Sequence, residues 1–280
     1  MKIAVIGLGL IGGSMAKDLK ERNFASYIYG VESNSENAKM ALDLKLADEI
    51  VTQEQAIDNS ELIIIATPVN ITISILPNIL DRVTNQIVTD MGSTKSKIVE
   101  CVKSHPNRKN FVAAHPMAGT EFSGPSAAIT GLFENKTTIL CNIEESSEDA
   151  ANIVRKMFSV LKMNVVEMKG ASHDVHVAYV SHISHISSIA LALTVMDIER
   201  DEKNIFNLAS GGFESTVRLA KSSADTWVPI FMQNDKNVLT ALNNYIDKLQ
   251  ELKIFIKEHK VDEMQSAIIK SNRIKEILKN

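Results

Sequence analysis

The chain has 280 residues, enough for one large domain or two ordinary ones, and its 45% hydrophobic and 23% charged residues are typical of a globular protein. Its net charge of −4 gives no electrostatic reason to expect nucleic acid or an anionic membrane surface as a partner, and no apolar run approaches the ~20 residues of a membrane span. The two cysteines, Cys101 and Cys141, lie in no Cys-x-x-Cys or Cys/His cluster, so we expect no disulfide framework, no metal site and a cytoplasmic location.

A glycine-rich motif follows the first predicted strand. Residues 2–6 form a short apolar run typical of buried parallel strands, and the next six residues are Gly7-Leu8-Gly9-Leu10-Ile11-Gly12. Residues 14–22 then have the pattern of a helix. In a dinucleotide-binding unit, the first glycine makes a tight turn, the second lets backbone N–H groups approach the pyrophosphate, and the third lets the helix pack closely. The sequence therefore predicts that residues 7–12 bind a dinucleotide, with a glycine-rich turn of another α/β protein as the alternative.

The choice of dinucleotide depends on the end of the second predicted strand. Residues 27–31 form this strand, and Glu32 follows it, 20 residues after Gly12. A carboxylate in this place binds the ribose 2′-hydroxyl of NAD and repels the 2′-phosphate of NADP. We therefore predict NAD as the cofactor, although Ser33 and Asn34 leave NADP open.

Strands and helices alternate up to residue 168. Further strands are predicted at residues 62–66, 86–89, 111–114, 137–142 and 164–168, and helices at 35–46, 71–83, 95–102 and 148–161. Thr67 and Pro68 end the strand at 62–66, at the sheet edge where ligands bind, so we expect both to contact the cofactor. This alternation predicts a Rossmann-type, doubly wound α/β domain over residues 1–168.

After residue 168 the pattern is entirely helical. Helices are predicted at residues 172–199, around Ile205, and at 213–221, 226–232, 235–259 and 261–278. We therefore expect an all-helical domain over residues 169–280, with the substrate in the cleft between the two domains. Apolar residues at helical spacing from Val238 to Phe255 form a stripe typical of core or dimer contacts, so we expect a homodimer through this domain.

Three segments bring together residues suited to catalysis. Asp90-Met91-Gly92-Ser93-Thr94-Lys95 and His115-Pro116-Met117-Ala118-Gly119-Thr120-Glu121 each follow a predicted strand. Both therefore lie at the carboxyl edge of the sheet, where the nicotinamide is expected. The third segment is His173-Asp174 followed by Ser181-His182-Ile183-Ser184-His185 on the long predicted helix.

These segments, together with the glycine motif, Arg218-Leu219-Ala220-Lys221-Ser222 and Trp227, resemble the prephenate/arogenate dehydrogenase family over the whole chain. Residues 115–121 are the most specific part of the resemblance. It implies an enzyme of tyrosine biosynthesis that uses NAD to convert prephenate to 4-hydroxyphenylpyruvate and CO2, with arogenate as an alternative substrate. No segment resembles a fused chorismate mutase or ACT domain, so we expect a monofunctional enzyme.

The chemistry and the resemblance together assign three roles. Imidazole suits proton acceptance near neutral pH, so His115 is expected to take the proton of the substrate's C4 hydroxyl, and Ser93 to orient that hydroxyl. Arg218 is expected to clamp a substrate carboxylate, because arginine binds carboxylates bidentately. The structural alternatives are a strand-end histidine, a helix N-cap and a surface ion pair, respectively.

The histidines of the long predicted helix can be placed by angle. At 100° per residue from His173, Asp174, His185 and His182 lie at about 100°, 120° and 180°, and His176 at about 300°. We therefore expect His185 and His182 at the cleft and His176 away from it. For His182, burial among helices is an equal alternative. His182 and His185 offer two metal ligands without a nearby third, so no metal is expected.

The resemblance adds further substrate contacts. It implies that Asp174 belongs to a polar network with Arg218 and Glu121, that Gly211 is part of a hinge or a backbone contact to the substrate side chain, and that Trp227 walls the substrate pocket. Two competing interpretations remain. Another two-domain dehydrogenase, such as a β-hydroxyacid dehydrogenase or pyrroline-carboxylate reductase, leaves residues 115–121 unexplained, and a non-enzymatic NAD-sensing module does not need His115 or Arg218.

Overall fold

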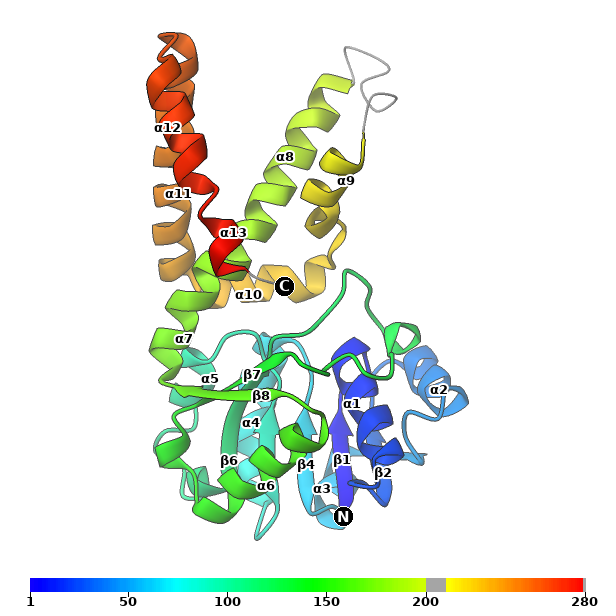
Figure 1. Ribbon diagram of the computed structural model, residues 1–280. Helices are drawn as coiled ribbons and strands as arrows, with labels where there is room; N and C mark the ends of the chain where they lie inside the picture. Colours follow the sequence, from blue (N-terminus) through cyan, green and yellow to red (C-terminus); the bar gives the residue numbers. More distant parts are fainter. Residues whose placement is uncertain (200–209, 279–280) are drawn as a thin grey trace.

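The computed structural model describes residues 1–199 and 210–278, and its amino-terminal part is built on one eight-stranded sheet (Figure 1). The strands in spatial order are β3 (Glu49–Ile50), β2 (Tyr27–Val31), β1 (Lys2–Ile6), β4 (Leu62–Ile65), β5 (Ile87–Asp90), β6 (Phe111–Pro116), β7 (Thr137–Cys141) and β8 (Asn164–Met168). Neighbouring strands are parallel except β6 and β7, which are antiparallel. The predicted Rossmann-type doubly wound sheet is confirmed.

Helices cover both faces of this sheet. They are α1 (Leu10–Glu21), α2 (Ser35–Asp43), α3 (Gln53–Asn59), α4 (Val69–Arg82), α5 (Ser96–Glu100) and α6 (Glu148–Val160). Met15 of α1 and Val154 of α6 belong to the core on one face, and Leu76 of α4 and Ile98 of α5 to the core on the other. Strand β4 is fully buried between the two cores, as its continuous apolar sequence requires.

Two short elements differ from the sequence expectation. Strand β3 and helix α3 occupy residues for which no element was predicted. β3 has only two residues, too few for a periodic pattern. The start of α3 is fixed by a capping box, in which the Thr52 side chain accepts from the Gln55 N–H and the Gln55 side chain from the Thr52 N–H.

The chain after β8 is helical in its described part. Its elements are α7 (Gly170–Val177), a π-helical turn (Ala178–His182), α8 (Ile183–Glu199), α9 (Gly211–Val217), a 3₁₀ turn (Arg218–Lys221), α10 (Ala224–Gln233), α11 (Asp235–Lys257), α12 (Val261–Ser271) and α13 (Ile274–Ile277). The single helix predicted at 172–199 is thus divided by a π-helical turn, and the one at 261–278 is broken after Ser271. The helix predicted around Ile205 lies outside the described residues.

Helix α10 anchors the helical region on the sheet domain. Its Ile230 is buried and joins the same core cluster as Val69 at the start of α4. Beyond α10, α8 with α9 and α11 with α12 rise as two diverging arms (Figure 1). This arrangement places the first turns of the helical region, α7 and the π-helical turn, near the carboxyl ends of the strands, where an α/β sheet binds its ligands.

Candidate active site

The glycine turn between β1 and α1 has the backbone that a dinucleotide requires. Gly7 has a φ of +91°, which an L side chain rarely adopts. A Cβ on Gly12 would lie 1.9 Å from the Gly7 carbonyl oxygen, so helix and turn pack too closely for any side chain there. A Cβ on Gly9 would meet nothing nearer than 4.0 Å, which leaves open space in front of the helix N-terminus. Residues 7–12 therefore fit a bound pyrophosphate.

Glu32 and Thr67 flank this turn. Glu32 follows β2, and its carboxylate accepts from the Leu8 N–H at 3.3 Å and the Asn34 N–H at 3.1 Å. A Cβ built on Gly7 would lie 3.2 Å from the Thr67 side chain, so Thr67 borders the turn, and Pro68 caps α4 beside it. Glu32, Thr67 and Pro68 thus lie beside the glycine turn, and their contacts with the cofactor stay a prediction.

A line of buried hydrogen bonds begins at His115, at the carboxyl end of β6. The Nδ1 atom of His115 lies 2.8 Å from Nε2 of His173. The Nδ1 atom of His173 lies 2.8 Å from Oδ1 of Asp174. All three side chains are buried. His173 was the reference point of the angular argument and was not expected at the site, yet it is the residue that joins His115 to the helical region.

Asp174 is bound to the backbone at the start of α5. Its two carboxylate oxygens accept from the backbone N–H groups of Lys95 and Ser96, each at 2.8 Å, in addition to His173. In the described part of the chain it forms no hydrogen bond or ion pair with Arg218 or Glu121. Asp174 thus holds the start of α5, and its expected network with Arg218 and Glu121 stays a prediction.

Burial dominates the electrostatics of His115 and His173. Burial lowers the pKa of His115 well below its usual value, and electrostatic repulsion from His173, Lys95 and His182, where these are protonated, lowers it further. Burial also lowers the pKa of His173, although its hydrogen bond to Asp174 opposes the change. For Asp174, burial raises the pKa, but the hydrogen bonds from His173, Ser96 and Lys95 together outweigh it and lower the pKa. The line thus consists of two neutral imidazoles and a carboxylate at neutral pH.

A buried ion pair lies next to this line. The side chain of Lys95 is fully buried and donates to the Asp90 carboxylate and, at 2.6 Å, to the Ala114 carbonyl. Asp90 also accepts from the Gly92 N–H at 2.8 Å. Ser93 lies between these residues, half-buried in the loop from β5 to α5. The N-cap of α5 is Lys95, so Ser93 is not the helix cap.

Arg218, in the 3₁₀ turn after α9, pairs with Glu121, in the segment after β6. Nη1 of Arg218 lies 3.3 Å from Oε2 of Glu121. The guanidinium is about half exposed, so the pair is open to solvent and to an incoming anion. The positive charge of Arg218, after burial itself, contributes to a lowered pKa of His185. The structure therefore brings Arg218, Glu121 and His185 into one region.

Trp227 packs against the histidines of the long helix. The rings of His185 and Trp227 are stacked, with centroids 3.3 Å apart and planes 24° apart. His182 is buried, meets Trp227 edge-on, and its Nδ1 lies 3.3 Å from the Asn234 amide nitrogen. Burial lowers the pKa of His182 to about 4. This position matches the alternative of a histidine buried among helices. Gly211 lies at the exposed start of α9, with no atom within 4 Å of a Cβ built on it.

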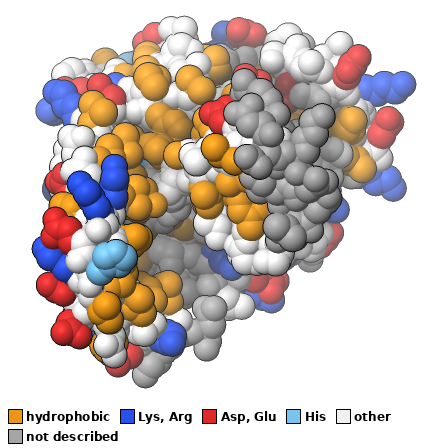
Figure 2. All heavy atoms as spheres, turned by 90° about the horizontal axis from the view of Figure 1, so that it is seen from above, with side chains coloured by type: hydrophobic (Ala, Val, Ile, Leu, Met, Phe, Trp, Pro, Cys, Tyr) orange, Lys and Arg blue, Asp and Glu red, His pale blue; other side chains and the backbone are white. Residues whose placement is uncertain are grey.

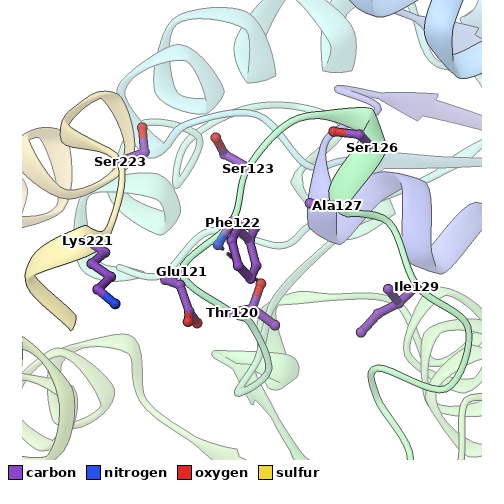
Figure 3. Close-up of a pocket in the computed structure, with 9 residues that line it drawn as sticks. All are labelled: Thr120, Glu121, Phe122, Ser123, Ser126, Ala127, Ile129, Lys221 and Ser223. Carbon is purple, nitrogen blue, oxygen red and sulfur yellow. Dashed lines mark hydrogen bonds between the residues drawn. The ribbon is translucent and has the colours of Figure 1, made fainter. Parts of the chain in front are cut away.

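A cavity of about 640 Å³ lies between the segment after β6 and the start of α10 (Figure 3). Thr120, Glu121 and Phe122 border it from one side, and Lys221 and Ser223 face them from the other. The same segment continues to Ile129, whose N–H donates to the Ser14 hydroxyl of α1 at 3.0 Å. The cavity is therefore bordered by Glu121 and by a segment that is hydrogen-bonded to α1.

Sequence reasoning did not assign a site role to His173 or Lys95. The signal for His173 was its place beside Asp174, but a straight helix puts it on another face from His182. The π-helical turn changes that relation, because each residue in it rotates by less than 100°. The signal for Lys95 was its position five residues after Asp90 across a glycine-containing turn, which allows the two side chains to meet.

Comparisons with known proteins agree with this geometry. The family profile described as "Prephenate dehydrogenase, nucleotide-binding domain" matches residues 15–167, and "Prephenate dehydrogenase, dimerization domain" matches residues 169–270. The prephenate dehydrogenase of Bacillus subtilis (strain 168) is 30% identical over 266 residues, which cover 94% of this chain and 72% of that protein.

Solved structures extend the likeness to the fold. A crystal structure of prephenate dehydrogenase from A. aeolicus, in complex with hydroxyphenyl propionate and NAD+, has a TM-score of 0.89 at 30% identity and covers 99% of this chain and 97% of that one. Synechocystis arogenate dehydrogenase has a TM-score of 0.78 at 27% identity, with 99% of each chain covered. The glycine turn, the buried histidine at the end of β6 and these matches lead to one conclusion: the chain belongs to the prephenate dehydrogenase family of NAD-dependent oxidoreductases.

Proposed function

We propose that the chain oxidatively decarboxylates prephenate to 4-hydroxyphenylpyruvate, and that residues 1–168 bind NAD while residues 169–280 complete the substrate site. The observation that carries the proposal is His115, a buried and neutral imidazole at the same sheet edge as the glycine turn. A neutral imidazole is the proton acceptor that oxidation of an alcohol requires. NAD, held at residues 7–12 and Glu32, would supply the acceptor for the hydride of the substrate ring.

The proposed reaction neither releases nor takes up a net proton. Hydride leaves C4 as the C4 hydroxyl proton passes to Nε2 of His115, so C4 becomes a carbonyl carbon. The bond from C1 to its carboxylate then breaks, CO2 leaves, and the electron pair makes the ring aromatic with its charge on the C4 oxygen. The proton held by His115 returns to that oxygen. Ser93, in the loop after β5, is proposed to hydrogen-bond the same hydroxyl and to fix its direction.

The substrate carries two carboxylates, and Arg218 is proposed to bind the one on the side chain. Its guanidinium is half exposed and already paired with a carboxylate, Glu121, so the position is suited to an anion. His185, stacked on Trp227, is proposed to contact the substrate beside it. Glu121 would then be displaced from Arg218 when substrate binds. His182 and Gly211 are proposed to shape the pocket rather than to take part in proton transfer.

Arogenate is the second candidate substrate, because a relative with 27% identity is an arogenate dehydrogenase. Arogenate has an ammonium group on its side chain where prephenate has a ketone. The experiment is a spectrophotometric assay of NADH formation with prephenate and with arogenate, each with NAD and NADP. We expect the highest kcat/KM with prephenate and NAD. An Arg218→Gln variant should raise KM for prephenate much more than it lowers kcat, since it removes a carboxylate contact.

A homodimer is part of the proposal. Exposed apolar side chains lie on both arms, among them Leu193 and Met196 of α8 and Leu249 and Ile256 of α11. Figure 2, which views this end from above, shows hydrophobic side chains on both arms around a hollow. In the described part of the chain, residues 170–199 form one helix that is long and apolar enough to cross a membrane by length and composition alone, and 17% of its most apolar 18-residue window is buried. We propose that a second copy, rather than a membrane, covers this surface. The same helical segment carries His173 and Asp174, which are hydrogen-bonded to His115 and Ser96 of the sheet domain.

The proposed location is the cytoplasm. Cys101 and Cys141 are both free thiols, one exposed and one buried. Free thiols of this kind are typical of proteins kept in a reducing compartment.

A further inference from the structure

The line from His115 to Asp174 fixes the protonation of both rings. A carboxylate only accepts hydrogen bonds, so Nδ1 of His173 must donate to Oδ1 of Asp174. A neutral His173 then has a lone pair on Nε2, which accepts from Nδ1–H of His115. The Nε2 atom of His115 is therefore left without a proton, and this is the nitrogen that does not face His173.

We infer that His173 and Asp174 are positioning residues: they hold His115 in the tautomer whose Nε2 accepts the substrate's C4 hydroxyl proton, and they take up the charge that this proton brings. This inference rests on the proposed function. Neither residue touches the substrate in the arrangement proposed. Both act through His115, and the sequence analysis gave His173 no role.

The proton transfer is balanced at each atom. When Nε2 of His115 forms a bond to the hydroxyl proton, Nδ1 of the same ring releases its own proton to Nε2 of His173. His115 is then neutral again, and His173 is an imidazolium beside the Asp174 carboxylate. The two transfers reverse when the proton returns to the phenolate oxygen of the product, so the enzyme ends in its starting state.

The surroundings explain why the charge moves away from His115. His115 is buried near the positively charged Lys95 and near His182, and neither stabilises a cation on its ring. The charge of Lys95 is paired with Asp90 on its other side. Among the acidic side chains that the structure describes, Asp174 alone is in direct contact with a histidine of this line. Asp174 is held in place by the N–H groups of Lys95 and Ser96, so it cannot turn away from His173.

Asp174 also accepts hydrogen bonds from the N–H groups at the start of α5. The experiment must therefore distinguish the positioning role from a purely structural one. Histidine tautomers provide the readout, since a structural role would not fix which nitrogen of His115 carries the proton. We would record long-range ¹H–¹⁵N spectra of the ¹⁵N-histidine-labelled chain without cofactor. The variants are His173→Phe, which removes the acceptor, and His173→Gln, which keeps one. His176→Gln is the matched control, since His176 is exposed on the same helix.

In the wild-type chain we expect the His115 proton on Nδ1 and none on Nε2. In His173→Phe the proton should move to Nε2, because Nδ1–H would be buried without an acceptor. Turnover of prephenate should fall about 100-fold in kcat, with KM within about twofold, since general-base catalysis contributes ~10²–10⁴. The kcat of His173→Gln should be at least about tenfold higher than that of His173→Phe, and the kcat of His176→Gln should match the wild type.

Two results would overturn the inference: a wild-type His115 with its proton on Nε2, or a folded His173→Phe variant with kcat within about threefold of wild type. If His173→Phe does not fold, the wild-type tautomer and His173→Gln still decide. Failure of the wild type to oxidise either prephenate or arogenate would refute the proposed function instead, and the tautomer measurement, made without substrate, would remain a separate result.

Discussion

The ammonium of Lys95 and the carboxylate of Asp90 form an ion pair in which neither side chain is exposed to solvent. Lys95 also donates to the Ala114 carbonyl, one residue before His115. The pair thus joins the ends of β5 and β6 beneath the loop that carries Ser93. Its removal should affect the position of the site and the stability of the domain together.

The first prediction concerns this pair. Lys95→Met leaves the Asp90 carboxylate buried without its partner, which costs about 3–5 kcal/mol in other proteins. We expect the free energy of unfolding, measured by urea denaturation, to fall by that order, and Asp90→Asn in the same chain to restore part of it. Lys103→Met is the control, since its pair with Glu100 is exposed, and should change stability by less than about 0.5 kcal/mol. Equal effects of the two lysine changes would contradict the account.

The second prediction separates two glycines of the same turn. A Cβ at Gly12 would lie 1.9 Å from the Gly7 carbonyl oxygen, so Gly12→Ala should lower the thermal unfolding temperature of the chain. A Cβ at Gly9 has open space, so Gly9→Ala should keep the stability but weaken NAD binding at least about tenfold, since the methyl group occupies space assigned to the pyrophosphate. Fluorescence titration with NADH checks the second part. A Gly9→Ala chain that binds NADH normally would refute this placement of the cofactor.

The third prediction is a loss of stability in mild acid. His115, His173, His182 and His185 all have lowered pKa values, with burial the main cause, and that of His182 is about 4. The pKa of His182 is about 6.5 in the unfolded chain and about 4 in the folded chain. At pH values between these two, His182 is protonated to a greater extent in the unfolded chain. Stability is therefore complete above pH ~6.5 and falls towards pH 4, by about 3 kcal/mol for His182. Urea denaturation at several pH values should show a smaller fall in His182→Gln, and an unchanged slope would count against the cause given.

The fourth prediction tests the homodimer. Leu249 of α11 is 48% exposed in a single chain, and Leu249→Glu places a charge in the proposed contact. Sedimentation at decreasing concentrations should show a dimer for the wild type and a larger monomer fraction for the variant. Leu42→Glu is the matched control, because Leu42 of α2 is 41% exposed outside the proposed contact. A monomeric wild type at all concentrations would remove the dimer from the proposal.

The sheet domain was largely predictable because its strands are continuous apolar runs and its ligand-binding turn needs glycine at fixed positions. Strand β3 was not predictable, because two residues carry no period and its place is set by pairing with Tyr29 and Gly30 of β2. The break in the last predicted helix after Ser271 was not predictable either, because no glycine or proline occurs there.

The site was predictable where strand ends fix it and not where the helix geometry is irregular. His115 follows from its position at the end of β6, and the meeting of Arg218 with Glu121 from the family resemblance. The position of His182 relative to His173 was not predictable, because the angular argument assumed a regular helix across the π-helical turn. Hydrogen bonds between distant chain segments, such as the one from the Ser96 N–H to Asp174, cannot be recognised in a single sequence.

The most direct test of the account is the His115→Asn variant, assayed for NADH formation with prephenate beside the wild type. Asparagine keeps a polar side chain at the end of β6 but offers no imidazole to accept the proton. We predict that the variant binds NADH in a fluorescence titration as the wild type does and loses at least about 100-fold in kcat. A folded His115→Asn chain with near-normal turnover of prephenate would contradict the central claim that this buried imidazole accepts the hydroxyl proton.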